Sequence, residues 1–250
     1  MDEIEKFTQE YRFRLASTAE ERNRIFALRY EVFNQELNYS LSEDRVRQLE
    51  MDHFDEVADQ CYVEHIASGT VVGCVRLVLP GSLKQDQDNE ARLPIEHYCG
   101  ESLKNSLSKL GVISRDQLCE VSRLAIPRRF RLQDLRGSIS HEEIPCSRKE
   151  SVLVGESLFL AGLAMVGLAG RQHILAFMEP KFPRLLARSG LVFQRVSDMF
   201  EICGRRAAYY LDQHQGVRKM QPGLHTLYRQ INHELHEQYL RQQAIQAESH

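Results

Sequence analysis

Residues 62–79 read YVEHIASGTVVGCVRLVL, two β-rich runs that flank a short polar segment. Tyr62–Ile66 and Val71–Leu79 are rich in β-branched residues, and Gly69 between them is a typical turn residue. The pattern predicts two antiparallel strands joined as a hairpin. Arg76 stands inside the second run, where a charged side chain needs a partner if it is buried.

The segments downstream indicate how the sheet continues. Leu118–Ile126 is a further predicted strand that ends at Pro127, and the apolar helix Ser151–Arg171 and the strand Ile174–Met178 follow it. Antiparallel strands followed by a strand–helix–strand crossover predict an α/β fold of the α+β kind. Its central sheet is mixed, mostly antiparallel and flanked by helices, and a doubly wound parallel sheet is excluded.

The remaining elements are predicted from capping patterns and apolar spacing. Thr18 and Glu21 form a capping-box pattern at the start of a helix, and the tail Gly223–Ala247 has apolar residues at helical spacing. We expect a main domain over residues 1–215 and a C-terminal helical extension over residues 216–250. Further strands are expected at Arg12–Ala16, Val192–Phe200 and Arg206–Leu211, and further helices at Ile95–Leu110 and Pro180–Arg188.

Composition excludes several classes of function. The 250 residues carry 32 Lys and Arg against 35 Asp and Glu, and a net charge of −3 does not suit a nucleic-acid-binding protein. The six cysteines lack the Cys-x-x-Cys pairs of zinc and redox sites, so no metal is expected. Met1–Glu10 has no apolar core of a signal peptide, which predicts a cytoplasmic protein. Glu156 interrupts the most apolar helix, which favours a buried core helix over stable membrane insertion.

Three short motifs carry the functional argument together, although each alone is weak. They are Leu28-Arg29-Tyr-Glu-Val-Phe33 with Tyr39 beyond it, Glu50-Met-Asp52-His-Phe-Asp55, and Gly73-Cys-Val-Arg76-Leu77 followed by Glu120-Val-Ser122-Arg123. In this order they resemble the acyl-homoserine lactone (autoinducer) synthases and the long-chain N-acyl amino acid synthases, a branch of the GNAT acyltransferase superfamily. Within that branch, Met178-Glu-Pro180 and residues 204–210 look most similar to the acyltransferases associated with exosortase and PEP-CTERM protein sorting.

The resemblance implies a GNAT-like acyltransferase domain over residues 1–215 and assigns its site residues. It places Glu120, Ser122 and Arg123 in the catalytic strand. It implies substrate contacts for Arg29, Phe33, Tyr39, Asp52, Asp55, Arg76, Leu124, Ala125 and Ala176, the last near the position that tunes chain fit in lactone synthases. Lactone synthases usually have Trp where this chain has Tyr39, which argues against a lactone-type acceptor pocket.

The charged members of this set would form an ion-pair network near one sheet. Such a network either takes part in catalysis or only holds the fold together, since structural ion pairs resemble active sites.

Acyl transfer to an amine needs a base for the nitrogen and hydrogen-bond donors for the developing oxyanion. Glu120 is the expected base, acting directly or through water. The backbone N–H groups of Arg123–Ala125 would be the oxyanion donors if the strand carries the bulge typical of the superfamily. Cys119 lies beside Glu120, but no histidine at a fixed place supports a covalent acyl-enzyme.

The acyl donor is inferred from a missing motif and from charge. No Gly-x-Gly loop of the kind that binds the pyrophosphate of coenzyme A follows Pro127. Seven basic residues against three acidic ones lie between Arg123 and Lys149. This excess suits docking of the acidic acyl carrier protein, and the alternative is a solvated loop. The expected docking residues are Arg128, Arg129, Arg131, Arg136, Arg148 and Lys149.

The sequence therefore predicts an N-acyltransferase that needs no cofactor. It would transfer a medium or long fatty acyl chain from acyl carrier protein, or else from coenzyme A, to the amine of an amino acid or related small acceptor. The helix over residues 152–168 and the strand Ile174–Met178 would wall the acyl tunnel. One alternative is an autoinducer synthase that uses S-adenosylmethionine, and another is a catalytically silent GNAT-like domain that binds acyl carrier protein or a sorting partner.

Overall fold

A twisted central sheet organises the protein. The computed structural model describes residues 3–39, 41–80, 92–111, 114–131 and 148–248. Among the described strands, β6 and β7 run parallel and the other neighbours run antiparallel, which confirms the predicted mixed, mostly antiparallel sheet. In sheet order the strands are β1 (Tyr11–Leu15), β4 (Asp59–His65), β5 (Thr70–Val78), β6 (Leu118–Ala125), β7 (His173–Met178), β10 (Arg205–Asp212) and β8 (Gln194–Arg195), with β9 (Phe200–Glu201) also paired to β10.

The predicted hairpin is formed by β4 and β5. Tyr62 pairs with Cys74, and Gly69 in the connecting turn has a φ of +66°, a conformation that glycine adopts without steric cost. Gly73 allows close helix packing, because a Cβ atom there would lie 2.6 Å from Cδ1 of Leu158. The long apolar helix therefore lies directly on the hairpin.

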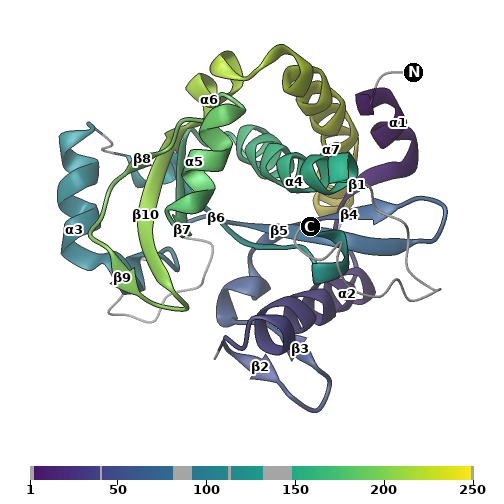
Figure 1. The fold of residues 1–250 in the computed structure, drawn as a ribbon, viewed down its shortest axis with the longest axis horizontal. Helices are drawn as coiled ribbons and strands as arrows, with labels where there is room; N and C mark the ends of the chain where they lie inside the picture. Colours follow the sequence, from purple (N-terminus) through teal and green to yellow (C-terminus); the bar gives the residue numbers. More distant parts are fainter. Residues whose placement is uncertain (1–2, 40, 81–91, 112–113, 132–147, 249–250) are drawn as a thin grey trace.

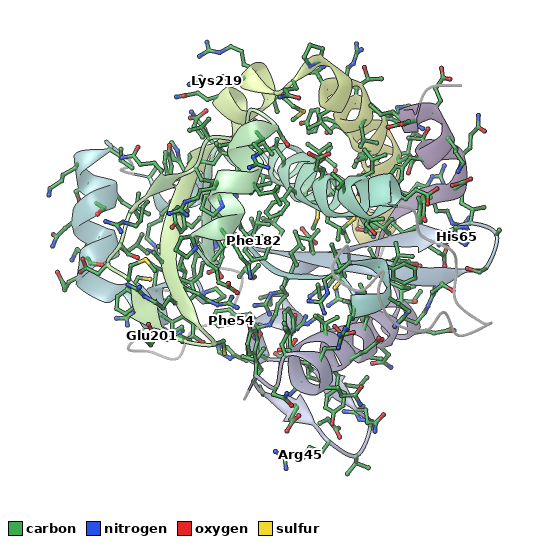
Figure 2. The ribbon with its side chains drawn as sticks, viewed as in Figure 1. Arg45, Phe54, His65, Phe182, Glu201 and Lys219 are labelled. Carbon is green, nitrogen blue, oxygen red and sulfur yellow. The ribbon has the colours of Figure 1, made fainter. Side chains whose placement is uncertain are left out.

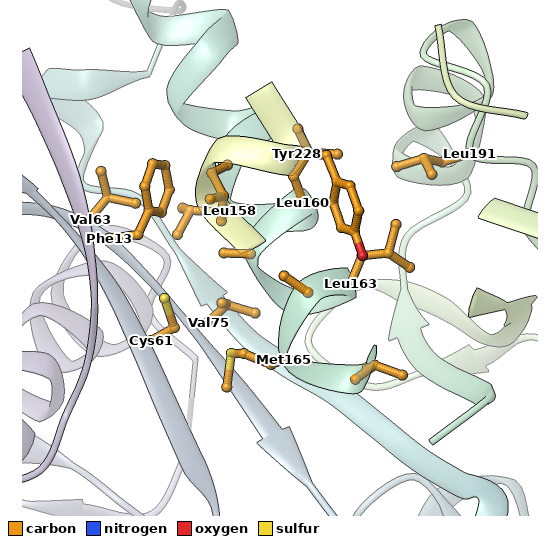
Figure 3. Close-up of a cluster of buried hydrophobic side chains, with 14 of the residues drawn as sticks. Phe13, Cys61, Val63, Val75, Leu158, Leu160, Leu163, Met165, Leu191 and Tyr228 are labelled. Atoms are coloured by element: carbon orange, nitrogen blue, oxygen red, sulfur yellow. The ribbon is translucent and has the colours of Figure 1, made fainter. Parts of the chain in front are cut away.

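One face of the sheet is covered by α4 (Arg148–Leu168), α7 (Pro222–Glu248) and α1 (Glu3–Glu10), as Figure 1 shows. Leu158 and Leu163 of α4 meet Val63, Val75 and Tyr228 in the largest hydrophobic cluster (Figure 3). Residues 150–168 are long and apolar enough to cross a membrane, but 56% of this window is buried inside the protein. This burial is typical of a core helix.

The C-terminal helix α7 also protects the edge of the sheet. The backbone N–H groups of Phe13 and Leu15 in the edge strand β1 donate to the side chains of Glu234 and Gln238 at 3.0 and 2.9 Å. The amide of Gln238 donates back to the carbonyl of Phe13 at 2.8 Å. An edge strand exposes unpaired backbone groups, so these bonds block pairing with another chain. The helix is thus an integral part of the packing.

The other face carries α2 (Ala19–Arg29) and α3 (Glu96–Lys109). The predicted capping box is present, since Thr18 and Glu21 bond to each other's backbone at the start of α2. Figure 1 shows α2 under β5 and α3 beside β10. The segment after α2 contains a π-helix at Tyr30–Glu36, the strands β2 (Glu43–Asp44) and β3 (Leu49–Glu50), and a 3₁₀ turn at His53–Glu56.

Two sequence expectations are corrected. The predicted strand over 192–200 is wrong, because only the short β8 and β9 form there. Between them, the hydroxyl of Ser197 accepts a 2.8 Å hydrogen bond from the N–H of Ala208 in β10. In a regular β-ladder, a backbone carbonyl would accept this bond. The N-terminal α1 had no predicted counterpart. The remaining elements are α5 (Lys181–Arg188), α6 (Gln213–Lys219), and 3₁₀ turns at Arg115–Gln117 and Arg128–Phe130.

Candidate active site

The parallel strands β6 and β7 separate at the centre of the sheet. Their ladder pairs Leu118 with His173 and ends where Glu120 pairs with Leu175. Beyond this point a cavity of about 560 Å³ is lined by the last residues of both strands. A gap between strands leaves backbone groups free to meet a ligand, so the separation marks a binding site.

The cavity connects both faces of the sheet and differs in character between them. Phe54 lines it from the 3₁₀ turn below the sheet and Phe182 lines it from α5, as Figure 2 shows. Toward α4 the lining is apolar: Phe159, Leu163, Ile174, Leu191, Phe193 and Leu211. Toward the 3₁₀ turn and α3 it includes Asp52, His53, His97, Glu120, Ser122 and Arg123.

Glu120 is the buried acid of the cavity. It is 3% exposed, and its Oε2 accepts a 2.7 Å hydrogen bond from the backbone N–H of Ile95. Burial is the largest influence on this carboxyl group and raises its pKa to about 7, although nearby arginines and the Ile95 bond act in the opposite direction. A carboxyl group with this pKa accepts and releases a proton near neutral pH.

A buried ion-pair network lies next to this acid. Arg29, at the end of α2, donates from Nε to Glu50 at 2.5 Å and from both Nη atoms to the two oxygens of Asp55 at 2.7 and 2.9 Å. Burial opposes charge on Arg29 and Asp55, but their mutual hydrogen bonds and attraction are stronger. They raise the pKa of Arg29 and hold the pKa of Asp55 well below its usual range. Both groups therefore stay charged.

Arg76 joins this network from the middle of β5. Its Nη1 donates to Asp52 at 2.7 Å and to Asp55 at 3.0 Å, and its Nε donates to the hydroxyl of Ser122 at 3.1 Å. The charge that the sequence placed inside an apolar strand thus has two carboxylate partners, although its buried Nη2 bonds to no described residue.

Arg123 completes the network at the cavity wall. It donates to Glu50 at 3.0 Å and to Asp52 at 2.9 Å. The network then contains three arginines and three carboxylates, so its charges cancel. Glu120 is not part of this neutral set of ion pairs. When its carboxyl group is ionised, no cation is left over to neutralise it.

The bulge expected after Glu120 is present. Between β5 and β6, Cys74 pairs with Ala125 while Arg76 pairs with Ser122, so β6 carries one extra residue. Arg123 has a φ of +51° at this position, and the thiol of Cys74 lies 3.7 Å from its carbonyl oxygen. The irregular backbone therefore begins next to the buried acid.

Most predicted site residues meet at this cavity. Those that line it are Phe33, Tyr39, Asp52, Glu120, Ser122, Arg123, Leu124 and Ala176. Those that do not are Arg29, Asp55, Arg76 and Ala125, each at most 3% exposed. The second set lies behind the cavity wall, so its contact with substrate stays a prediction from the sequence resemblance.

The predicted carrier-protein patch looks different in the structure. Arg129 and Arg131 are ion-paired with Glu31 and Glu36 of the π-helix, and the N–H of Arg128 donates to Glu36 at 2.8 Å. Arg136 lies outside the described residues, and Arg148 and Lys149 begin α4. Two of the expected docking cations are thus neutralised by carboxylates of the same chain. The sequence did not predict these ion pairs, because the acidic partners lie more than 90 positions away.

A covalent acyl-enzyme at Cys119 finds little support. Cys119 is fully buried, and burial raises the pKa of its thiol far above the ordinary value, so it is no nucleophile. Within the described ranges, no group of three or more His, Cys, Asp and Glu is placed to hold a metal ion.

Sequence reasoning missed several residues of the site. Glu50 belongs to a quoted motif, but nothing in the sequence shows that it is buried between two arginines. Ile95 acts through its backbone, and Arg206 reaches the cavity from β10, within a quoted segment (204–210) to which no site role was given.

The comparisons agree with this geometry. The profile of the acetyltransferase (GNAT) domain matches residues 28–137, which hold all six members of the network. No curated protein matches the sequence. Similar solved structures are BjaI, a CoA-dependent acyl-homoserine lactone synthase (16% identity, covering 88% of this chain and 89% of that chain, TM-score 0.59), FeeM, an N-acyl amino acid synthase from uncultured soil microbes (14%, 86% and 97%, 0.55), and the AHL synthase LasI (15%, 81% and 90%, 0.52).

At these identities the structural likeness shows the fold, and the predicted GNAT-like fold is confirmed. Together with the domain match, it indicates an acyltransferase.

Proposed function

We propose that this chain is an N-acyltransferase that joins a medium or long fatty acyl chain to the amine of an amino acid or related small acceptor. One observation carries the proposal. Glu120, a buried carboxyl group with a pKa of about 7, lines a cavity whose other part is apolar. A base next to a long apolar lining suits a reaction between a polar amine and a fatty thioester.

The proposed reaction uses few groups. Glu120 takes a proton from the acceptor ammonium, directly or through water, and the free amine attacks the thioester carbonyl. The backbone N–H groups of Arg123–Ala125 are the proposed donors to the oxyanion. Collapse of the tetrahedral intermediate breaks the C–S bond, the thiol leaves with one proton, and the second proton passes from Glu120 to solvent.

The apolar part of the cavity is the proposed acyl tunnel. Phe159 and Leu163 of α4 and Ile174 and Ala176 of β7 line it, on the helix and the strand expected from the sequence. Burying methylene groups there is favourable by about 0.8 kcal/mol each, which would favour long chains.

Acyl carrier protein remains the proposed donor. Its proposed docking site is the surface of α5 and α6, and not the basic patch predicted from the sequence. The helices α5 and α6 contain no acidic residue, and Arg184, Arg188, Arg218 and Lys219 are exposed on them. The segment just after α5 contacts the end of α6, since a Cβ atom on Gly190 would lie 2.2 Å from the carbonyl oxygen of Lys219. Figure 2 shows Lys219 on this side of the molecule.

This α5–α6 surface lies next to the cavity, because Lys181 and Phe182 of α5 line it. A basic surface beside the opening suits an acidic carrier that must deliver its thioester. Coenzyme A is the competing donor, and BjaI is described as CoA-dependent.

A second candidate function is an acyl-homoserine lactone synthase, favoured by the likeness to BjaI and LasI. Tyr39, where lactone synthases usually have Trp, argues against it. The association with exosortase and PEP-CTERM sorting stays a prediction from the sequence resemblance, as does a cytoplasmic location.

Mass spectrometry of lipid extracts tests the proposal. Cells that overproduce the protein should accumulate an N-acyl amino acid, and cells that overproduce the E120Q variant to the same level should not. An acyl lactone would establish the second candidate. No acylated product in either culture would point to a catalytically silent domain.

A further inference from the structure

Four cationic side chains line the cavity within the described part of the chain, and three are matched closely by carboxylates. Arg123 is paired in the buried network, Arg131 pairs with Glu36, and Lys181 lies 2.8 Å from Glu179. The fourth, Arg206, is different. Its nearest carboxylate, at 3.9 Å, is Glu179, which already pairs with Lys181. Arg206 and Lys181 therefore share one negative charge.

Neutral groups hold Arg206 in place. Its Nε donates to the carbonyl of Cys203 at 3.1 Å, its Nη2 donates to the hydroxyl of Tyr39 at 3.2 Å, and its guanidinium carbon lies 5.3 Å from the centre of the Tyr39 ring. These contacts fix the plane of the guanidinium but use only two of its five N–H groups. The side chain is 22% exposed and lines the cavity.

We propose that Arg206, assisted by Lys181, binds the carboxylate of the acceptor. This inference rests on the proposed function and names the acceptor as an amino acid. A guanidinium with unused N–H groups binds a carboxylate through two parallel hydrogen bonds, and the local excess of one positive charge favours an anion. Glu120 lines the same cavity, so an acceptor held at Arg206 directs its amine toward the base.

The position of Arg206 in the sheet sets the length of acceptor to be tested. Arg206 precedes Ala207, which pairs with Met178, whereas Glu120 pairs with Leu175. Arg206 therefore falls opposite position 179, four residues from Leu175, so the two sites are about 13 Å apart along β7, at roughly 3.3 Å per residue, before their side chains extend. Both α-amino acids and ω-amino acids with longer spacers belong in the test.

The test compares each amino acid with the amine that lacks its carboxylate. Wild-type protein should prefer the amino acid, and R206Q should raise its KM about 10- to 100-fold, as expected for charge-assisted hydrogen bonds. KM for the matched amine should not change in R206Q. The matched control is R205Q, because Arg205 is exposed, pairs with Glu201 and does not line the cavity.

Calorimetric titration of the same ligands into R206Q, without donor, separates binding from turnover. Binding of the amino acid should be lost while the thermal melt stays like that of R205Q. If R206Q weakens amino acids and amines equally, Arg206 only fixes Tyr39 and the inference is overturned. Equal use of amines and amino acids by the wild type would also overturn it, whereas no acylation of any amine would overturn the proposed function itself.

Discussion

The backbone N–H of Ile95 donates a 2.7 Å hydrogen bond to Oε2 of Glu120, linking the start of α3 to the centre of the sheet. A backbone donor does not titrate, so it holds the carboxyl group in one place in both protonation states. The proton affinity of Glu120 is then governed by burial, which raises its pKa to about 7. The Ile95 bond thus fixes the position of the base and lowers its pKa, but burial outweighs this effect.

The activity should depend on this ionisation. Because the base must be unprotonated, kcat/KM should rise with pH and level off above about 7, with a tenfold loss per pH unit well below that value. The profile should be measured with two acceptors whose amine groups have different pKa values. If Glu120 sets the midpoint of the rise, the midpoint stays at about 7 with both acceptors, whereas a midpoint set by the amine would move with it. A limb near 4.5 would show that Glu120 has the pKa of an ordinary glutamate.

Stability should depend on the same group with the opposite trend. The folded pKa of Glu120 is raised above the unfolded value, so its contribution is most favourable below about pH 4.5 and is lost as pH rises through about 7. E120Q, which keeps an acceptor for Ile95, should therefore be more stable than wild type at pH 8, by on the order of 3 kcal/mol. Urea unfolding at pH 8 and pH 4.5 measures this, and a difference independent of pH would refute a buried, titrating carboxyl group.

The ion-pair network should be sensitive to the loss of one member. E50Q removes the carboxylate that Arg29 and Arg123 share, and breaking a buried pair costs about 3 to 5 kcal/mol. The control is D44N, because Asp44 pairs with Arg47 at the surface, where an ion pair contributes little to stability. If both variants unfold at the same urea concentration, the network contributes little to stability.

Docking of the carrier protein should depend on the α5–α6 surface. The double variant R184E/R188E should lower kcat/KM with acyl carrier protein about tenfold or more at low salt, and added salt should reduce wild-type rates because it screens steering. Transfer from a short acyl-pantetheine should be unaffected. The charge-reversal control is R45E, since Figure 2 places Arg45 at the opposite end of the molecule from Lys219. Equal losses in the two variants would remove this surface from the account.

Local patterns predicted the sheet well. The β-rich runs around Gly69 predicted the hairpin, whose strands are neighbours in sequence. The apolar helix between two predicted strands predicted the parallel pair, because such a crossover joins parallel strands. Val192–Phe200 looked equally β-rich, but a side-chain hydroxyl at Ser197 replaces part of the ladder, which no periodicity reveals.

Long-range pairing was the main source of error at the site. The convergence of Asp52, Asp55 and Arg76 followed from the family resemblance, but Glu50, although quoted in a motif, was given no role. The ion pairs of the basic patch could not be predicted either, since Glu31 and Glu36 meet Arg129 and Arg131 only once the chain has folded.

The most direct measurement is amide formation by purified protein, supplied with acyl carrier protein charged with a fatty acid and with amino acid acceptors, and read by mass spectrometry. Wild type should form N-acyl amino acid at pH 8. E120Q, equally folded, should lose about 10²- to 10⁴-fold in kcat, the range that a positioned base contributes. Wild-type turnover in E120Q with saturating acceptor would contradict the account, because Glu120 would then have no part in the chemistry.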